Sequence, residues 1–162
     1  FLFLSLSLSL SLVLKERMSD WAWGCDDEVI DCYGLMEEGK AAYAIFSLDE
    51  TRNQVHRTHL GKKEDWGALL DSLPPDNCRW AVYFFNYDET KKIVFISWIP
   101  KSATNGEKSR YERSTPSLKR FFGAKIVELV GEQRDDLGWG FVEEKVFGQV
   151  VGMHVKSANK RN

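Results

Sequence analysis

The chain has 162 residues, of which 43% are hydrophobic, and this composition suits one compact domain with a substantial core. Its formal net charge of −2 at pH 7 argues against a general nucleic-acid binder, so an electrostatic partner must be met by a local patch of charge. The three cysteines, Cys25, Cys32 and Cys78, are odd in number and widely spaced. This usage favours a reducing compartment, the cytosol, over a disulfide framework.

Residues 1–17 differ in kind from the rest of the chain, because Ser and Leu alternate in an apolar run that ends at Leu14. The run is shorter than the roughly 20 apolar residues of a membrane span, so we expect no stable membrane insertion. It lacks the basic leader and small-residue cleavage site of a secretory signal, although its length would suit a signal anchor. We expect the native protein to begin at Met18, with 1–17 a non-native or disordered leader, 18–150 the domain and 151–162 a polar tail.

Helix and strand patterns alternate through the expected domain. Helices are predicted from apolar residues spaced three and four apart, and strands from short apolar runs between turn residues. In chain order the sequence predicts a helix from Asp26 to before Gly39, strands over 41–48 and 54–60, a helix from Trp66 to Leu73, strands over 78–87 and 92–99, a basic helix within 99–122, a strand over 124–130 and a last helix over 141–146. The two strands of the middle pair are nearly continuous in apolar character, which indicates central positions covered on both faces. Strands flanked by helices on both sides give an α/β layered domain.

The segment 99–122 concentrates positive charge on a predicted helix. Four residues fall on one helical face at i, i+3, i+7 and i+10: Arg110, Arg113, Ser117 and Arg120. A less polar stripe lies beside them, formed by Tyr111, Ser114, Leu118 and Phe121. Pro116 lacks the backbone N–H that would bond to residue 112, so we expect a kinked or broken helix. The plainer interpretation of the same pattern is a solvated basic face.

Several motifs, in this order and spacing, resemble the actin-depolymerising factor/cofilin family. They are YAIFSL, SLPPDNCRWAVYFFNYDET, KKIVFISWIP and KSRYERSTPSLKRFFGAKIVEL. They are similar to the family's leucine-proline step, its strand of the type Asp-Cys-Arg-Tyr-Ala-Val-Tyr, its phenylalanine-rich strand ending in Trp-x-Pro and its long helix opening on Lys-x-x-Tyr. The resemblance runs from about Asp27 to Phe147. It implies an α/β fold with a central mixed five- to six-stranded sheet sandwiched between helices on both faces, no cofactor, no metal and no enzymatic activity.

The resemblance also implies a function, namely binding to monomeric and filamentous actin with filament severing and depolymerisation. It implies a monomer in the cytoplasm, at the actin cytoskeleton. The family's main actin-binding helix matches the basic segment, so the implied contacts with monomer and filament are Lys108, Arg110, Tyr111, Arg113, Ser114, Ser117 and Arg120. A filament-specific surface is implied at Lys91, Lys92, Glu144 and Lys145. Glycines at 106 and 148 stand where the family commonly carries cations, which removes two charges from the rims of these surfaces.

Two modes of regulation follow from the same resemblance. Family members are switched by phosphorylation of a serine near the mature N-terminus, and Ser19 is the only serine near Met18. A regulatory kinase is therefore an implied partner, with an ordinary flexible tail as the alternative. Phosphoinositides inhibit family members, and Lys108, Arg110 and Lys119 would attract them by charge.

Other functions are possible on the same sheet. Coactosin-like proteins bind filaments without severing them, and the glia-maturation-factor group acts on filament branches. An actin filament or branch binder without severing is therefore the alternative function. The helix with Lys108 and Tyr111, together with the filament-specific surface, favours the severing family.

Catalytic and metal chemistry find little support in the sequence. His56 and His59 form H-x-x-H, but odd spacing on a strand is expected to send their side chains to opposite faces, which argues against a shared metal. A thiol-dependent activity would fall to Cys78, which stands at the start of a predicted strand and is expected to face the core. The sequence contains no glycine-rich phosphate loop and no nucleophile elbow.

Overall fold

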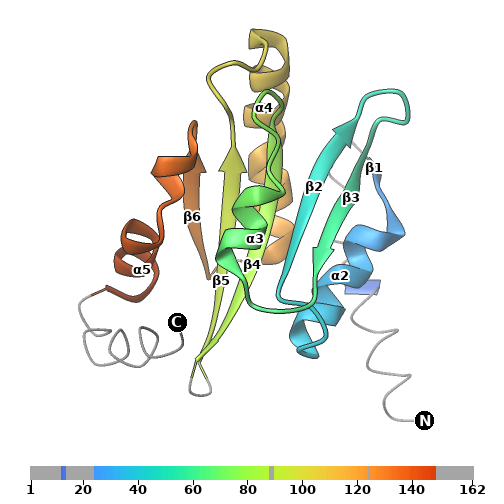
Figure 1. The fold of residues 1–162 in the computed structure, drawn as a ribbon. Coiled ribbons are helices and arrows are strands. Elements are labelled where there is room, and N and C mark those ends of the chain that lie inside the picture. The colour runs from blue at the N-terminus through green and yellow to red at the C-terminus, as the bar shows by residue number, and fades with distance from the viewer. Residues whose placement is uncertain (1–11, 14–23, 88–89, 124, 149–162) are drawn as a thin grey trace.

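The computed structural model describes residues 12–13, 24–87, 90–123 and 125–148, and Figure 1 shows its fold. Its strands and helices are β1 (Gly24–Cys25), α2 (Asp27–Glu37), β2 (Tyr43–Asp49), β3 (Gln54–Gly61), α3 (Trp66–Asp71), β4 (Arg79–Tyr87), β5 (Thr90–Trp98), α4 (Asn105–Phe122), β6 (Ile126–Gly131), the 3-10 helix η1 (Arg134–Leu137) and α5 (Trp139–Phe147). Most of the expected leader, Ser19 and the expected tail lie outside the described residues. None of the described helices is both long and apolar enough to cross a membrane.

The strands form one mixed sheet in the order β1-β3-β2-β4-β5-β6. β2 pairs antiparallel with β3 and β4, and β4 pairs antiparallel with β5 through a regular register from Arg79↔Trp98 to Tyr87↔Thr90. β6 pairs parallel with β5, and a parallel neighbour requires a crossover, which α4 provides. The predicted mixed sheet is confirmed, with β4 and β5 inside it.

Helices cover both faces of the sheet, and each face has its own core. α2 and α4 pack on one face, where Val29, Cys32, Met36, Tyr111, Leu118, Phe121 and Phe122 meet side chains of β2, β4 and β5. α3 and α5 pack on the other face, where Trp66, Leu69, Val142 and Val146 meet the alternate side chains of the same strands. Figure 1 shows α3 and α4 on opposite sides of the sheet. The layered α/β architecture expected from the sequence is therefore confirmed.

α4 is one continuous helix of 18 residues, so a broken helix at Pro116 is wrong, and the expected kink stays a prediction. Buried side chains before and after the proline, Tyr111 and Leu118 among them, hold both halves against the same sheet face. Pro116 and Glu112 are exposed, so water can satisfy the Glu112 carbonyl that loses its usual donor. The helix begins where the Thr104 hydroxyl accepts the Glu107 N–H at 3.2 Å.

A β-bulge in the β2–β3 pair corrects a second prediction. On β3, His56 lies opposite Ser47 of β2, and His59 lies opposite Ile45, two residues before Ser47. Three residues of β2 therefore face four residues of β3, and Thr58 is the extra residue. The extra residue places both histidines on one sheet face, and their expected separation to opposite faces is wrong. They still have separate partners, because His56 Nε2 lies 3.0 Å from the Ser47 hydroxyl and His59 stacks on Tyr43. Within the described ranges, no cluster of three or more His, Cys, Asp or Glu side chains suits a metal.

Candidate functional site

The solvent-facing side of α4 is the centre of the predicted site. We call it the crest, and its exposed residues are Ser109, Glu112, Arg113, Pro116 and Arg120. Among the described residues, neither Arg113 nor Arg120 has a carboxylate partner within ion-pair distance. Ser114 and Ser117 are half-buried on the flank of the crest, where the Ser114 hydroxyl donates to the Arg110 carbonyl at 2.9 Å. Of the predicted basic face, the two unpaired arginines are the charges most available to a partner.

Tyr111 is the predicted contact that the structure places in the core. Its side chain is 4% exposed, and its ring centroid lies 4.3 Å from that of Trp80. The Trp80 indole N–H donates to the Thr115 hydroxyl at 3.0 Å, one turn further along α4. Because both α4 residues are buried, Tyr111 anchors the helix to the sheet and does not reach a partner in this conformation.

The N-terminal end of α4 is fixed by polar contacts. Glu107 accepts the backbone N–H of Cys78 at 2.8 Å, which ties the first turn to the start of β4. Lys108 is half-buried, and its ammonium donates to the carbonyl of Lys101 at 2.9 Å, in the loop before the helix. The loop is itself held by Ser102, whose hydroxyl lies 2.8 Å from the Asp76 carboxylate. Lys108 therefore projects from a braced end of the helix.

Arg110 leaves α4 on the flank that faces the β2–β3 turn. Its Nη2 atom lies 2.6 Å from Oε1 of Glu50, and the two side chains are 39% and 58% exposed. An exposed ion pair of this kind contributes about 0–1 kcal/mol. Arg110 is therefore a half-buried, partnered cation, unlike Arg113 and Arg120.

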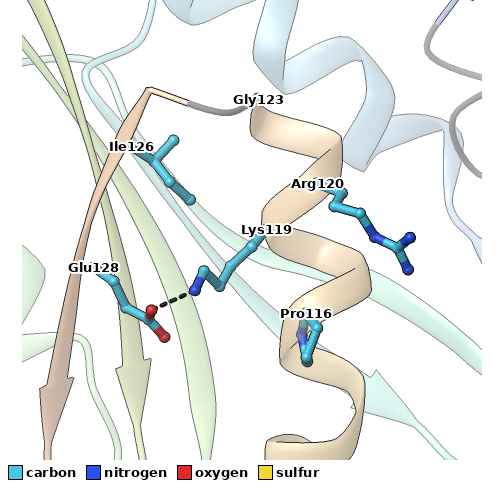
Figure 2. A pocket seen from close by; sticks show the side chains of 6 residues that line it. All are labelled: Pro116, Lys119, Arg120, Gly123, Ile126 and Glu128. Atoms are coloured by element: carbon cyan, nitrogen blue, oxygen red, sulfur yellow. Dashed lines mark hydrogen bonds and ion pairs between the residues drawn. The ribbon is translucent and has the colours of Figure 1, made fainter.

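A hollow of about 400 Å³ opens at the C-terminal end of α4, lined by Pro116, Lys119, Arg120, Gly123, Ile126 and Glu128. Figure 2 shows Lys119 pointing across it to an ion pair with Glu128 of β6, while Arg120 points away. Lys119 is eleven residues beyond Lys108, which places their backbones about 16 Å apart along the axis. The structure therefore does not gather the residues predicted for phosphoinositides, Lys108, Arg110 and Lys119, around one headgroup.

The predicted filament-specific surface is divided by the sheet. Lys91 and Lys92 are consecutive on β5, so their side chains point to opposite faces. Lys91 donates to the Glu37 carboxylate at 3.2 Å, on the α2 side. Lys92 is exposed and shares its face with Val94, which packs in the core beneath α3 and α5. Lys92 therefore belongs with α5, and Lys91 does not.

α5 carries the other half of that surface. Glu144 and Lys145 are both exposed, and the Lys145 ammonium lies 5.7 Å from the ring centroid of Phe141. Phe141 is 51% exposed on the same side of the helix. Sequence reasoning did not select it, although an aromatic residue one turn before a lysine on an exposed helical face is a readable signal. The three side chains form a mixed apolar and charged patch.

Comparison with known proteins identifies the family. Residues 23–147 match the family described as cofilin/tropomyosin-type actin-binding protein. The chain belongs to this family.

Individual family members and neighbours agree with that assignment. Actin-depolymerizing factor 9 of Arabidopsis thaliana is 30% identical over 109 residues, which cover 64% of this chain and 77% of that protein. The crystal structure of a cofilin from Streptomyces griseoflavus superimposes with a TM-score of 0.69 at 29% identity, covering 78% of this chain and 98% of that one. Coactosin from Entamoeba histolytica shares the fold alone, with a TM-score of 0.66 at 17% identity over 76% of this chain and 94% of that one.

The cofilin/ADF family is a family of actin-binding proteins and not of enzymes, and the thiols agree with this. Cys78 is buried, and burial, with the nearby Glu107 carboxylate, raises its pKa to about 11. Burial likewise raises the pKa of Cys25 and of Cys32 to about 12. Protonated thiols are poor nucleophiles, so the alternative of a thiol enzyme at Cys78 has no activated group to support it.

Proposed function

We propose that this chain binds monomeric and filamentous actin through α4 and promotes filament severing and depolymerisation. The observation that carries the proposal is the crest of α4, where Arg113 and Arg120 are exposed without carboxylate partners among the described residues. Behind the crest, Tyr111 and Phe121 are buried against the sheet, so the helix is a rigid element presented outward. Lys108, Arg110, Ser114 and Ser117 flank the crest and complete the proposed contact.

Two separate surfaces on one small domain can touch two neighbouring subunits of a filament. We assign the second surface to Lys92, Glu144 and Lys145, on the sheet face opposite α4, and leave out Lys91, which pairs with Glu37 on the α2 side. Charged rims steer the encounter, and buried contact area holds the complex. Binding on both sides of the sheet would let one copy strain the contact between subunits.

The test uses the chain from Met18 onward with purified actin. Cosedimentation measures filament binding, loss of fluorescence from pyrene-labelled actin measures disassembly, and imaging of single filaments counts cuts. We expect binding at micromolar concentration and shortened filaments. The paired change Lys108→Glu and Arg113→Glu should abolish monomer binding while the thermal unfolding midpoint stays near that of the unchanged chain. If the unchanged chain neither cosediments with filaments nor shortens them, the proposal is wrong.

A coactosin-like filament binder without severing is the second candidate. It is favoured by the glycines at 106 and 148, which leave both surfaces with fewer rim charges, and by the fold shared with coactosin. The same imaging experiment separates the two functions. Cosedimentation with intact filament lengths would support this second candidate.

Regulation and cellular setting belong to the same proposal. We assign the protein to the cytoplasm as a monomer, with actin as its main partner. Lys108, Arg110 and Lys119 would attract phosphoinositides as separate charges along the helix, because each lies at a different place on α4. Phosphorylation of Ser19 by a kinase would add about −1.5 to −2 charges near the N-terminus and weaken binding. Vesicle competition and a Ser19→Glu variant test these two points.

A further inference from the structure

The side chain of Arg110 lies between the space beside Gly106 and the carboxylate of Glu50. Long side chains on a helix lean back toward its N-terminus, and the Arg110 Nη1 atom lies 3.6 Å from the position that a Cβ of Gly106 would occupy. One end of the guanidinium therefore lies beside the space that Gly106 leaves without a side chain. Its Nε atom is buried without a hydrogen-bond partner among the described residues, and its Nη2 atom meets Glu50 at 2.6 Å. This is a packed guanidinium and not a freely moving surface cation.

Glu50 reaches Arg110 from a turn that is itself fixed. The Asp49 carboxylate accepts the backbone N–H groups of Thr51 and Arg52 at 3.0 and 3.2 Å. The preceding strand residue, Leu48, donates its N–H to the hydroxyl of Tyr111 on α4 at 2.9 Å. The turn is therefore ordered internally and joined to the helix next to the ion pair.

The contacts leave part of the guanidinium available. A guanidinium carries several N–H donors in a planar fork, and among the described residues only Glu50 pairs with it, through Nη2. The Nη1 donors lie over the exposed Gly106. Holding a long side chain in its bound conformation before binding reduces the entropy lost on association.

We propose that Glu50 is a positioning residue for Arg110, which it holds over Gly106 so that Nη1 is presented to an anionic group on actin. The inference deepens the proposed function and rests on it. A competing role for Glu50, as a counter-ion that masks Arg110 from actin, predicts the opposite sign in the binding test.

The first test needs no actin. Side-chain NMR of the free chain measures hydrogen exchange at the Arg110 Nε–H, which burial should slow. Glu50→Ala should speed this exchange several-fold, because the guanidinium loses its anchor. The matched control is Glu38→Ala, since Glu38 pairs at the same 2.6 Å and is 56% exposed, but its partner is Lys40 and not a residue of α4. Equal exchange rates in the Glu50→Ala and unchanged chains would overturn the positioning role.

The second test is a double-mutant cycle on actin affinity. Glu50→Ala should weaken binding about two- to five-fold, the range of an exposed ion pair, and should change nothing in an Arg110→Ala background. Glu38→Ala should leave affinity unchanged. Tighter binding by Glu50→Ala, or an equal loss in both backgrounds, would overturn the inference. If the unchanged chain fails to bind actin, the proposed function is wrong, and so is the part of this inference that has Arg110 contact actin. The exchange experiment still decides whether Glu50 holds Arg110.

Discussion

The hydroxyl of Tyr111 accepts a hydrogen bond of 2.9 Å from the backbone N–H of Leu48, and so joins α4 to the end of β2. Burial raises the pKa of this hydroxyl, so it stays protonated and neutral across the physiological range. The tyrosine of the motif Lys-x-x-Tyr therefore supports the proposed binding helix from within the core. The exposed residues around it are the proposed contacts with actin.

Tyr111→Phe should destabilise the fold while leaving actin affinity unchanged. The variant keeps the ring against Trp80 but removes the acceptor of the half-buried Leu48 N–H, and since a fully buried donor left unsatisfied costs about 1–3 kcal/mol, we expect a loss near the lower end of that range. Chemical unfolding measures the loss. A fall in affinity at unchanged stability would instead make the tyrosine a direct contact.

Pro116→Ala should stabilise the chain by about 2 kcal/mol. Restoring the backbone N–H in mid-helix should stabilise the folded chain by about 3 kcal/mol. Alanine also leaves the unfolded chain with more conformational freedom than proline does, which offsets about 1 kcal/mol of that gain. Pro116 is exposed, so no packing is lost. Thermal unfolding checks the sign, and a lowered midpoint would mean that the proline fits this helix better than its missing N–H suggests.

Removing the exposed arginines of the crest should weaken actin binding in a salt-dependent way. We expect Arg113→Ala and Arg120→Ala each to raise the dissociation constant about two- to five-fold at low salt, with a smaller effect at high salt. Arg134→Ala is the control, because this exposed arginine of η1 pairs with Asp71 and lies outside α4. Equal losses of actin affinity in all three variants would indicate that binding depends on the net charge of the protein and not on the crest.

The patch on α5 should contribute to binding of filaments and not to binding of monomers. Phe141→Ser removes the exposed ring beneath Lys145, and we expect cosedimentation with filaments to weaken about tenfold, as for an aromatic interface anchor. Monomer affinity should not change, because α5 lies on the face opposite α4. Val130→Ser is the matched control, since Val130 is 57% exposed but lies outside α5. Loss of monomer and filament binding together would contradict two separate surfaces.

The three thiols should resist modification until the chain unfolds. Near pH 8 the native thiols stay protonated, because burial raises their pKa values to about 11 and 12 from an ordinary 9.0. Thiol labelling should be slow in the native chain and fast in denaturant.

The same pKa shifts set the sign of an alkaline effect. Above pH 9 the unfolded chain releases its thiol protons first, so the free energy of unfolding should fall as pH rises toward about 12, and it should be unaffected by these groups below pH 9. Unfolding in urea at several pH values measures the slope. A slope that is the same in Cys32→Ala would exclude this thiol as its source.

Much of the fold is readable from local patterns. The spacing of apolar residues after Asp27 predicts α2, and the apolar runs around residues 79–87 and 92–98 predict the central hairpin, because helical and strand periods are properties of consecutive residues. β1 has two residues and pairs with β3 at the edge of the described sheet, so it is too short to show a strand period. The motifs also locate the basic helix and the family.

The sequence by itself determined the layered sheet, the basic helix and the membership of an actin-binding family. Only the tertiary structure decided that α4 continues through Pro116, that Tyr111 is buried, that Lys91 pairs with Glu37 of α2, and that Glu50 pairs with Arg110. Each of these depends on contacts between segments distant in the chain. Packing of that kind outweighs local propensity, and no period along the sequence records which distant carboxylate meets which cation.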